Sequence, residues 1–217
     1  MTASSTHPAG AARLRRNEAA DPVAGAADDP ASLGAALHAE ARDLVTVTLP
    51  HAPGQIEIQR YIRRETVWTG ELSQAFGAVP NKVPYVLDGA PHYPELLLVR
   101  LLEAAGWSAA WRKTWNGEAY WRDLREPMEL PEAITTALDQ VSARAGHAGQ
   151  WEVVAWRDRQ LRLLTSRTTG GQPVSAYQAE WLSIALRMGL PIGCFAVVEH
   201  RVPRAPRRRR LEHIRQP

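Results

Sequence analysis

The chain has one cysteine, Cys194, and two lysines, Lys82 and Lys113, among 217 residues. A single cysteine excludes a disulfide framework and a zinc site built from cysteines. The seven histidines stand at spacings that match no metal motif. Gly170–Gly171 is not followed by Lys-Ser or Lys-Thr, so no phosphate-binding loop of that type is predicted. These absences exclude three classes of functional site.

Long apolar runs are also missing, so no membrane-spanning segment is predicted. The N-terminus has no apolar stretch of the kind found in signal peptides. We therefore expect a cytoplasmic protein without a membrane partner. The net charge is +3, and 24 of the 26 basic residues are arginine. This bias, together with many alanines and prolines, is typical of a GC-rich genome and says little about individual arginines.

A β-hairpin is predicted within the stretch from Trp151 to Trp181. Two short apolar runs, Val153–Trp156 and Leu161–Leu164, flank the polar tetrad Arg157–Gln160, as expected for two strands joined by a tight turn.

A helix and another strand are predicted after this hairpin. Ser175 stands at an N-cap position before a helix that runs to about Met188. The run Ile192–Val198 reads as a buried strand. The predicted order is strand, strand, helix, strand.

Upstream, the clearest helix runs from Glu95 to Ala105, and a second runs from Pro131 to about Ala145. Asn116–Gly117 between two aromatic runs predicts a hairpin. Near the N-terminus the pattern predicts a helix over Ser32–Leu44 and a strand over Val45–Leu49 and leaves Gln55–Phe76 ambiguous between strand and helix. Seven of the eight tryptophans follow residue 106, and we expect them to form the core rather than to stack on bases.

The order of elements and several residues resemble the PD-(D/E)XK nuclease superfamily, closest to its VRR-NUC-like branch. Family members carry an acid where Glu152 begins the hairpin and an acid-x-Lys triplet where this chain has Thr165–Ser166–Arg167. They carry a helix glutamine, here Gln178, often followed by a tryptophan, here Trp181, and an acid in an upstream helix, here Glu95. The resemblance covers residues 93–199. It implies an α/β fold: a restriction-endonuclease-like mixed β-sheet of about four to six strands, flanked by helices.

Three of the matched positions depart from the family pattern. In the family, two carboxylates hold a divalent cation, usually Mg²⁺, and a lysine orients or deprotonates the attacking water. Here Glu152 is one methylene longer than aspartate, Thr165 brings no charge, and Arg167 stays protonated. The resemblance therefore implies a degenerate catalytic site formed by Glu95, Glu152, Thr165, Arg167 and Gln178.

The resulting expectation is a nuclease-fold protein, inactive or weakly active, that binds nucleic acid in the former cleft, DNA rather than RNA, and acts as a subunit beside a protein partner. No cofactor is expected. The alternative is an active endonuclease or exonuclease that holds Mg²⁺ with Glu95 and Glu152, with Glu180 replacing the missing acid. A second alternative is a protein–protein interaction module.

Four parts of the chain are predicted: a disordered N-terminal arm (1–30), an accessory segment (31–92), the nuclease-like domain (93–202) and a basic C-terminal tail (203–217). The tail contains four consecutive arginines, which serve either as a solvated end or as an electrostatic arm for nucleic acid. The candidate nucleic-acid-binding residues are Arg167 and Gln178 in the former cleft and, in the tail, Arg207, Arg208, Arg209 and Arg210.

Overall fold

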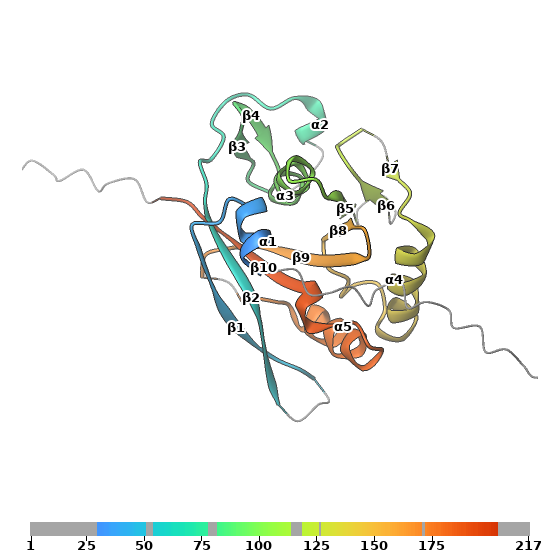
Figure 1. The fold of residues 1–217 in the computed structure, drawn as a ribbon. Helices are drawn as coiled ribbons and strands as arrows, with labels where there is room; N and C mark the ends of the chain where they lie inside the picture. Colours follow the sequence, from blue (N-terminus) through green and yellow to red (C-terminus); the bar gives the residue numbers. More distant parts are fainter. Residues whose placement is uncertain are drawn as a thin grey trace, which may run out of the picture.

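A computed structural model describes residues 30–50, 54–77, 82–113, 119–125, 127–170 and 172–203. The protein is an α/β protein built on an eight-stranded mixed sheet with the order β1-β2-β10-β9-β8-β5-β6-β7 (Figure 1). The strands are β1 (Ala41–Thr48), β2 (Gln55–Arg64), β5 (Ser108–Lys113), β6 (Ala119–Trp121), β7 (Pro127–Met128), β8 (Val153–Arg157), β9 (Gln160–Thr168) and β10 (Phe195–Arg201). β10 is parallel to both β2 and β9, and the other neighbouring strands are antiparallel.

Helices cover both faces of the sheet. On one face lie α1 (Pro30–Ala36) and α3 (Pro94–Ala104), and on the other lie α4 (Glu132–Ala145) and α5 (Ala176–Arg187). The short helix α2 (Gln74–Gly77) and the small sheet of β3 (Tyr85–Leu87) and β4 (Ala90–His92) lie on the α3 side of the molecule (Figure 1). No helix in the described ranges combines the length and apolar composition needed to cross a bilayer.

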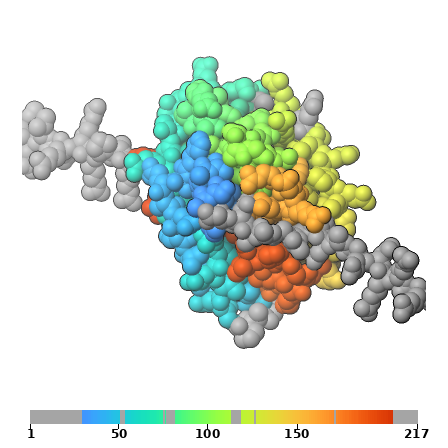
Figure 2. Space-filling view, in the orientation of Figure 1, coloured from blue at the N-terminus to red at the C-terminus, as the bar shows by residue number. Residues whose placement is uncertain are grey.

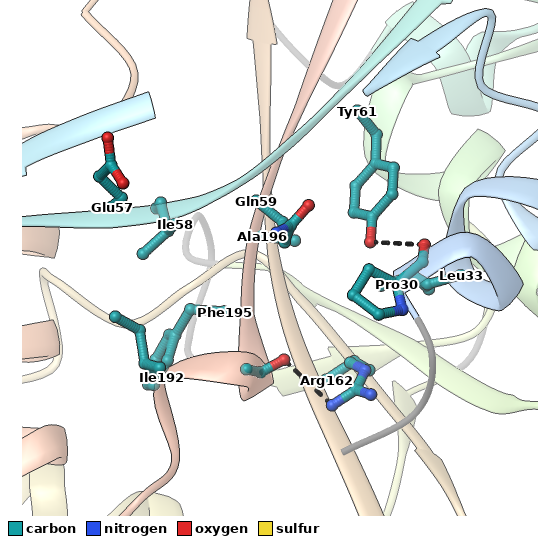
Figure 3. Close-up of a pocket in the computed structure, with 11 residues that line it drawn as sticks. Pro30, Leu33, Glu57, Ile58, Gln59, Tyr61, Arg162, Ile192, Phe195 and Ala196 are labelled. Atoms are coloured by element: carbon teal, nitrogen blue, oxygen red, sulfur yellow. Dashed lines mark hydrogen bonds between the residues drawn. The ribbon is translucent and has the colours of Figure 1, made fainter. Parts of the chain in front are cut away.

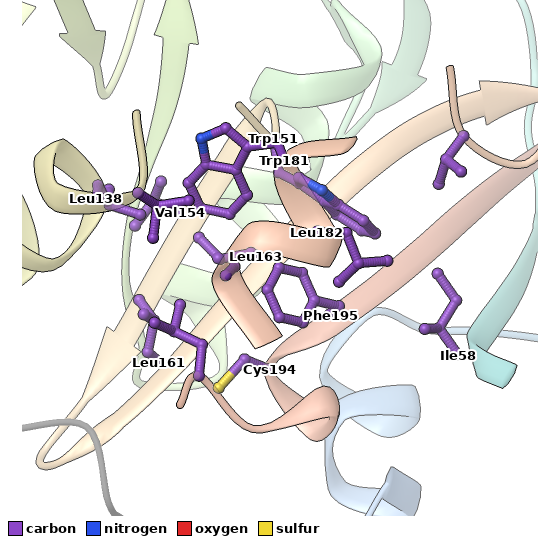
Figure 4. Close-up of a cluster of buried hydrophobic side chains, with 14 of the residues drawn as sticks. Ile58, Leu138, Trp151, Val154, Leu161, Leu163, Trp181, Leu182, Cys194 and Phe195 are labelled. Atoms are coloured by element: carbon purple, nitrogen blue, oxygen red, sulfur yellow. The ribbon is translucent and has the colours of Figure 1, made fainter. Parts of the chain in front are cut away.

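Side chains that alternate between the two faces of the central strands contribute to a hydrophobic core on each face of the sheet. On β9, Leu161 and Leu163 belong to the cluster under α4 and α5, whereas Leu164 belongs to the cluster under α3. Successive side chains of a strand point to opposite faces, so a strand buried on both sides reads as a continuous apolar run. Figure 4 shows the cluster under α5, where Trp151 and Trp181 both meet Phe195 edge-on, with ring centroids 5.1 and 6.3 Å apart.

The predicted hairpin and the helices α3, α4 and α5 are confirmed, and the tryptophan core is confirmed for four of the seven tryptophans after residue 106. Arg157 pairs with Gln160 across the β8–β9 turn, and Asp158 adopts a φ of 54° there. α3 and α4 lie within a residue of their predicted bounds. Four tryptophans are at most 4% exposed: Trp107, Trp111, Trp151 and Trp181. The Asn116–Gly117 turn lies outside the described residues, although β5 and β6 pair as predicted.

Two predicted boundaries are wrong. The strand expected over Ile192–Val198 begins only at Phe195, because Ile192–Cys194 forms a 3-10 turn in which the Cys194 N–H donates to the Pro191 carbonyl at 2.9 Å. The helix expected over Ser32–Leu44 ends at Ala36, and residues from Ala41 onward pair with β2. In the second case, tertiary strand pairing overrides a local helical pattern.

The N-terminal segment also enlarges the sheet beyond the expected size. The ambiguous stretch after Gln55 becomes the strand β2, which lies between β1 and β10. Residues 31–92, predicted as an accessory segment, therefore contribute two strands to the sheet. In the space-filling view the blue and cyan N-terminal residues and the red C-terminal residues form one continuous body (Figure 2). The sheet therefore has eight strands, whereas the sequence predicted about four to six.

Candidate functional site

Three of the predicted site residues meet where the β8–β9 hairpin opens. Val153 pairs with Leu164, so the next position along the ladder places Glu152 opposite Thr165. Thr165 and Arg167 are two residues apart on β9 and share a face with Glu152. Arg167 Nη1 donates to Glu152 Oε1 at 3.1 Å. Arg167 therefore lies beside Glu152, which immediately precedes β8, and the strand register puts Glu152 and Thr165 on one face of the hairpin.

Gln178 connects this strand end to the start of α5. The Gln178 N–H donates to Ser175 Oγ at 3.2 Å, and the Ser175 N–H donates to Gln178 Oε1 at 3.0 Å, which makes a capping box. Gln178 Nε2 also donates to Thr165 Oγ1 at 3.1 Å, and Gln178 Oε1 also accepts from Arg167 Nη2. The helix cap thus fixes the glutamine in a position where its amide holds both Thr165 and Arg167.

Arg167 retains hydrogen-bonding capacity after these contacts. A guanidinium has five N–H donors. Nη1 of Arg167 donates to Glu152 Oε1 and to the Ser166 carbonyl, the latter at 2.7 Å, and Nη2 donates to Gln178 Oε1. Two N–H groups, including the one on Nε, are left without a hydrogen-bond partner among the described residues. The side chain is 24% exposed, so an incoming anion can reach it.

Glu95 lies in the first turn of α3 and is 4% exposed. Its Oε1 accepts from Lys82 Nζ, which also lies 5.3 Å from the centroid of the Trp111 ring. Burial and the negative charges of Glu65 and Glu95 raise the pKa of the nearby Tyr85. Glu95 is thus a buried carboxylate that forms an ion pair with Lys82, 13 residues earlier in the chain.

These residues surround a cleft of about 350 Å³. Glu152, Arg167 and Gln178 line it, Thr165 is fully buried behind Gln178, and Glu95 connects to it through Lys82. All five residues of the predicted degenerate site thus belong to one region. The lining residues are Lys82, Trp111, Arg112, Ala148, Gln150, Glu152, Arg167, Ser175 and Gln178.

Sequence reasoning missed Lys82, Arg112 and Gln150. Arg112 is 5% exposed, and its N–H donates to the Glu152 carbonyl at 2.7 Å. Gln150 donates from Nε2 to the hydroxyl of Tyr120. The sequence held one signal for Lys82, which is one of only two lysines in an arginine-rich chain. The sequence holds no comparable signal for Gln150.

The donors at this cleft do not fit a divalent cation. Mg²⁺ requires several oxygen ligands in a nearly octahedral arrangement. Glu95 and Glu152 are each paired with a cation through Oε1, and the Thr165 hydroxyl is held by Gln178. Among the side-chain oxygens of these residues, only the buried Oε2 atoms of Glu95 and Glu152 are left without a hydrogen-bond partner in the described part of the chain, which is fewer ligands than Mg²⁺ requires. Glu180 does not line the cleft. Across the described ranges, no three His, Cys, Asp or Glu residues form a group that could hold a metal ion.

A second cavity, of about 220 Å³, shares no lining residue with the cleft. It lies between α1, β2 and the start of β10 and is bounded by Leu33, Tyr61 and Phe195 among others (Figure 3). Tyr61 donates to the Pro30 carbonyl at 3.0 Å, and Arg162 Nη1 donates to the Gly193 carbonyl at 3.0 Å. None of the predicted site residues lies there.

The predicted N-terminal arm, apart from Pro30, lies outside the described residues, and so do Arg207, Arg208, Arg209 and Arg210. Comparison of the chain with protein-family models, with curated proteins and with solved structures finds no match.

Proposed function

We propose that this chain is a PD-(D/E)XK-like protein of restriction-endonuclease-like fold that binds the phosphate backbone of nucleic acid in the cleft without cutting it. The observation that carries the proposal is Arg167, which Glu152 and Gln178 hold in place while two of its N–H groups remain available. A planar guanidinium can grip a phosphate through two hydrogen bonds without a metal ion.

The arrangement of elements supports this assignment. Helix α3 carries Glu95, the hairpin β8–β9 carries Glu152, Thr165 and Arg167, and α5 carries Gln178 before the parallel strand β10. These are the positions at which the family resemblance expects functional residues. Three of these residues line one cleft, and Glu95 and Thr165 each contact a residue that lines it. This arrangement would be a coincidence if the resemblance were accidental.

Binding without hydrolysis follows from the same residues. An arginine stays protonated at physiological pH and cannot serve as a general base. Thr165 supplies no negative charge, and its hydroxyl is engaged by Gln178. The missing carboxylate also removes a charge that would repel a phosphate in the absence of metal. With these residues in place of the family's acid and lysine, the cleft can bind a phosphate but has no group that activates water.

The test is fluorescence anisotropy of labelled double-stranded DNA, with single-stranded DNA and RNA compared next, over a salt series with and without EDTA. We expect affinity to fall steeply with salt, because counterions are released on binding, and to be unchanged by EDTA. Arg167→Ala should weaken binding by about 1–3 kcal/mol. Arg167→Lys should restore part of the loss, because it returns the charge without the planar fork.

Arg159→Ala is the matched control. Arg159 is an exposed arginine in the turn at the opposite end of the same hairpin. Its loss removes the same charge without touching the cleft and should leave affinity nearly unchanged. An Arg167→Ala protein that binds like wild type, or binding that EDTA abolishes, would contradict the proposal. Absence of binding to all three nucleic acids would favour a protein-interaction module.

A further inference from the structure

Lys82 is a second cation in the cleft, from a part of the chain outside the region of family resemblance. Its side chain is 31% exposed, whereas that of its partner Glu95 is 5% exposed. The lysine thus extends from the edge of the cleft toward a buried acid, and its ammonium lies over the ring of Trp111. Attraction to the ring face and to the carboxylate together hold the ammonium in a defined place.

The ammonium has donors to spare. It carries three N–H groups. One contact is to Glu95 Oε1, and no other hydrogen-bond partner for Lys82 lies in the part of the chain that the structure describes. Lys82 and Arg167 line the same cleft. Two partly exposed cations with unused donors therefore border one space.

A carboxylate holds each of these two cations at the cleft: Lys82 pairs with Glu95, and Arg167 pairs with Glu152. Both cations keep N–H groups that these pairs do not use. The oxygens of one phosphodiester can therefore accept from both cations without displacing either ion pair.

We propose that Lys82 is a phosphate-binding residue and that the cleft holds one backbone phosphodiester between Lys82 and Arg167. This inference rests on the proposed function and specifies how that function is carried out. Glu95 becomes a positioning residue that keeps the ammonium at the cleft, in place of the metal-ligand role that the family resemblance implies. Lys82 supplies a fixed positive charge in a site whose donors do not suit a divalent cation.

The experiment uses the same labelled double-stranded DNA. Removing Lys82 alone would leave the carboxylate of Glu95 buried and unpaired, which is destabilising. The principal variant is therefore Lys82→Met combined with Glu95→Gln, which removes both charges and keeps both side chains close to their original size. The matched control is Arg64→Met combined with Glu40→Gln, which removes an exposed pair (3.3 Å) that does not line the cleft. Circular dichroism checks that both proteins are folded.

We expect the Lys82/Glu95 variant to bind DNA about tenfold more weakly. The slope of the logarithm of its binding constant against the logarithm of salt concentration should be smaller by about one, as for loss of one phosphate contact. The control should bind like wild type. Lys82→Arg should keep most of the affinity, because it returns a cation at the same position. A DNA carrying uncharged methylphosphonate linkages should bind wild type and the Lys82/Glu95 variant equally weakly.

Two results would overturn the inference, and they separate it from the proposed function. If the Lys82/Glu95 variant binds with wild-type affinity and Arg167→Ala binds weakly, then Lys82 is not a phosphate-binding residue, and the proposed function still holds. Wild-type affinity in both proteins would remove the proposed function as well.

Discussion

Arg167 Nη1 lies 3.1 Å from Glu152 Oε1, and this pair joins the end of β9 to the residue that precedes β8. Both side chains are about one-quarter exposed. In the proposed PD-(D/E)XK-like assignment, these two positions correspond to a lysine and a metal-binding acid. In this chain the two side chains form an ion pair with each other.

Glu152→Gln should strengthen nucleic-acid binding. The change removes a negative charge from the cleft but keeps an amide oxygen that can accept from Arg167, so the phosphate gains attraction while the guanidinium keeps its partner. The free energy of unfolding should change by only about 0–1 kcal/mol, because the pair is partly exposed. Anisotropy at low salt measures the first effect and urea unfolding the second. Weaker binding in this variant would mean that Glu152 is needed to aim the guanidinium.

Gln178→Ala should destabilise the fold as well as weaken binding. The side chain is 3% exposed and contacts Ser175, Thr165 and Arg167, so its loss leaves buried polar groups unpaired. We expect a loss of about 1–3 kcal/mol in the free energy of unfolding. Ser175→Ala removes the other half of the capping box and should cost about 1 kcal/mol. Because the two residues form one box, the double variant should lose less than the sum of the single variants.

Glu65→Gln should destabilise the protein in a pH-dependent way. Glu65 is 3% exposed and accepts from Arg63 Nε at 2.7 Å, and His200 Nδ1 lies 2.8 Å from the same oxygen. Burial alone would raise the Glu65 pKa, but hydrogen bonds with His200 and Arg63 outweigh burial and lower the pKa below 4.5. A lowered folded-state pKa contributes stability above pH 4.5, and that stability is lost as the pH falls through the folded-state pKa.

At neutral pH we expect Glu65→Gln to lower the free energy of unfolding by about 3 kcal/mol, as for breaking a buried ion pair. Urea unfolding at a series of pH values should show the gap from wild type narrowing below pH 4.5. Glu40→Gln, which breaks the exposed pair with Arg64, is the control and should change stability by about 0–1 kcal/mol. If the difference in free energy of unfolding between wild type and Glu65→Gln stays constant down to acid pH, Glu65 is not ionised in the folded protein.

Restoring the family pattern should produce metal binding only when Lys82 is also removed. The triple change Glu152→Asp, Thr165→Glu and Arg167→Lys supplies the missing acid, but Lys82 still neutralises Glu95. Adding Lys82→Ala frees that carboxylate for a cation. Titration calorimetry with Mn²⁺ should therefore show binding by the quadruple variant and little by the triple variant. Equal affinity in the two proteins would show that Lys82 does not compete with the metal.

The sequence by itself determined the local geometry of the candidate site. The period of two along β9 places Thr165 and Arg167 on one face, and the spacing of Ser175 and Gln178 specifies a capping box that aims the glutamine. Both follow from bonds between residues close in sequence, so the spacing alone is sufficient. The start of α3 near Glu95 is predictable for the same reason.

Only the tertiary structure decided which distant segments complete the cleft. Lys82 reaches Glu95 because α3 packs against β3 and β4, and Arg112 joins the site because β5 pairs with β8. The place of β2 beside β10 likewise depends on pairing between residues more than 130 positions apart. The pairings of β5 with β8 and of β2 with β10 depend on the order of strands in the sheet, and the Lys82–Glu95 contact depends on how α3 packs on β3 and β4. No local spacing encodes either. The proposed phosphate-binding residue Arg167 could therefore be identified in the sequence, whereas its proposed companion Lys82 could be identified only in the folded chain.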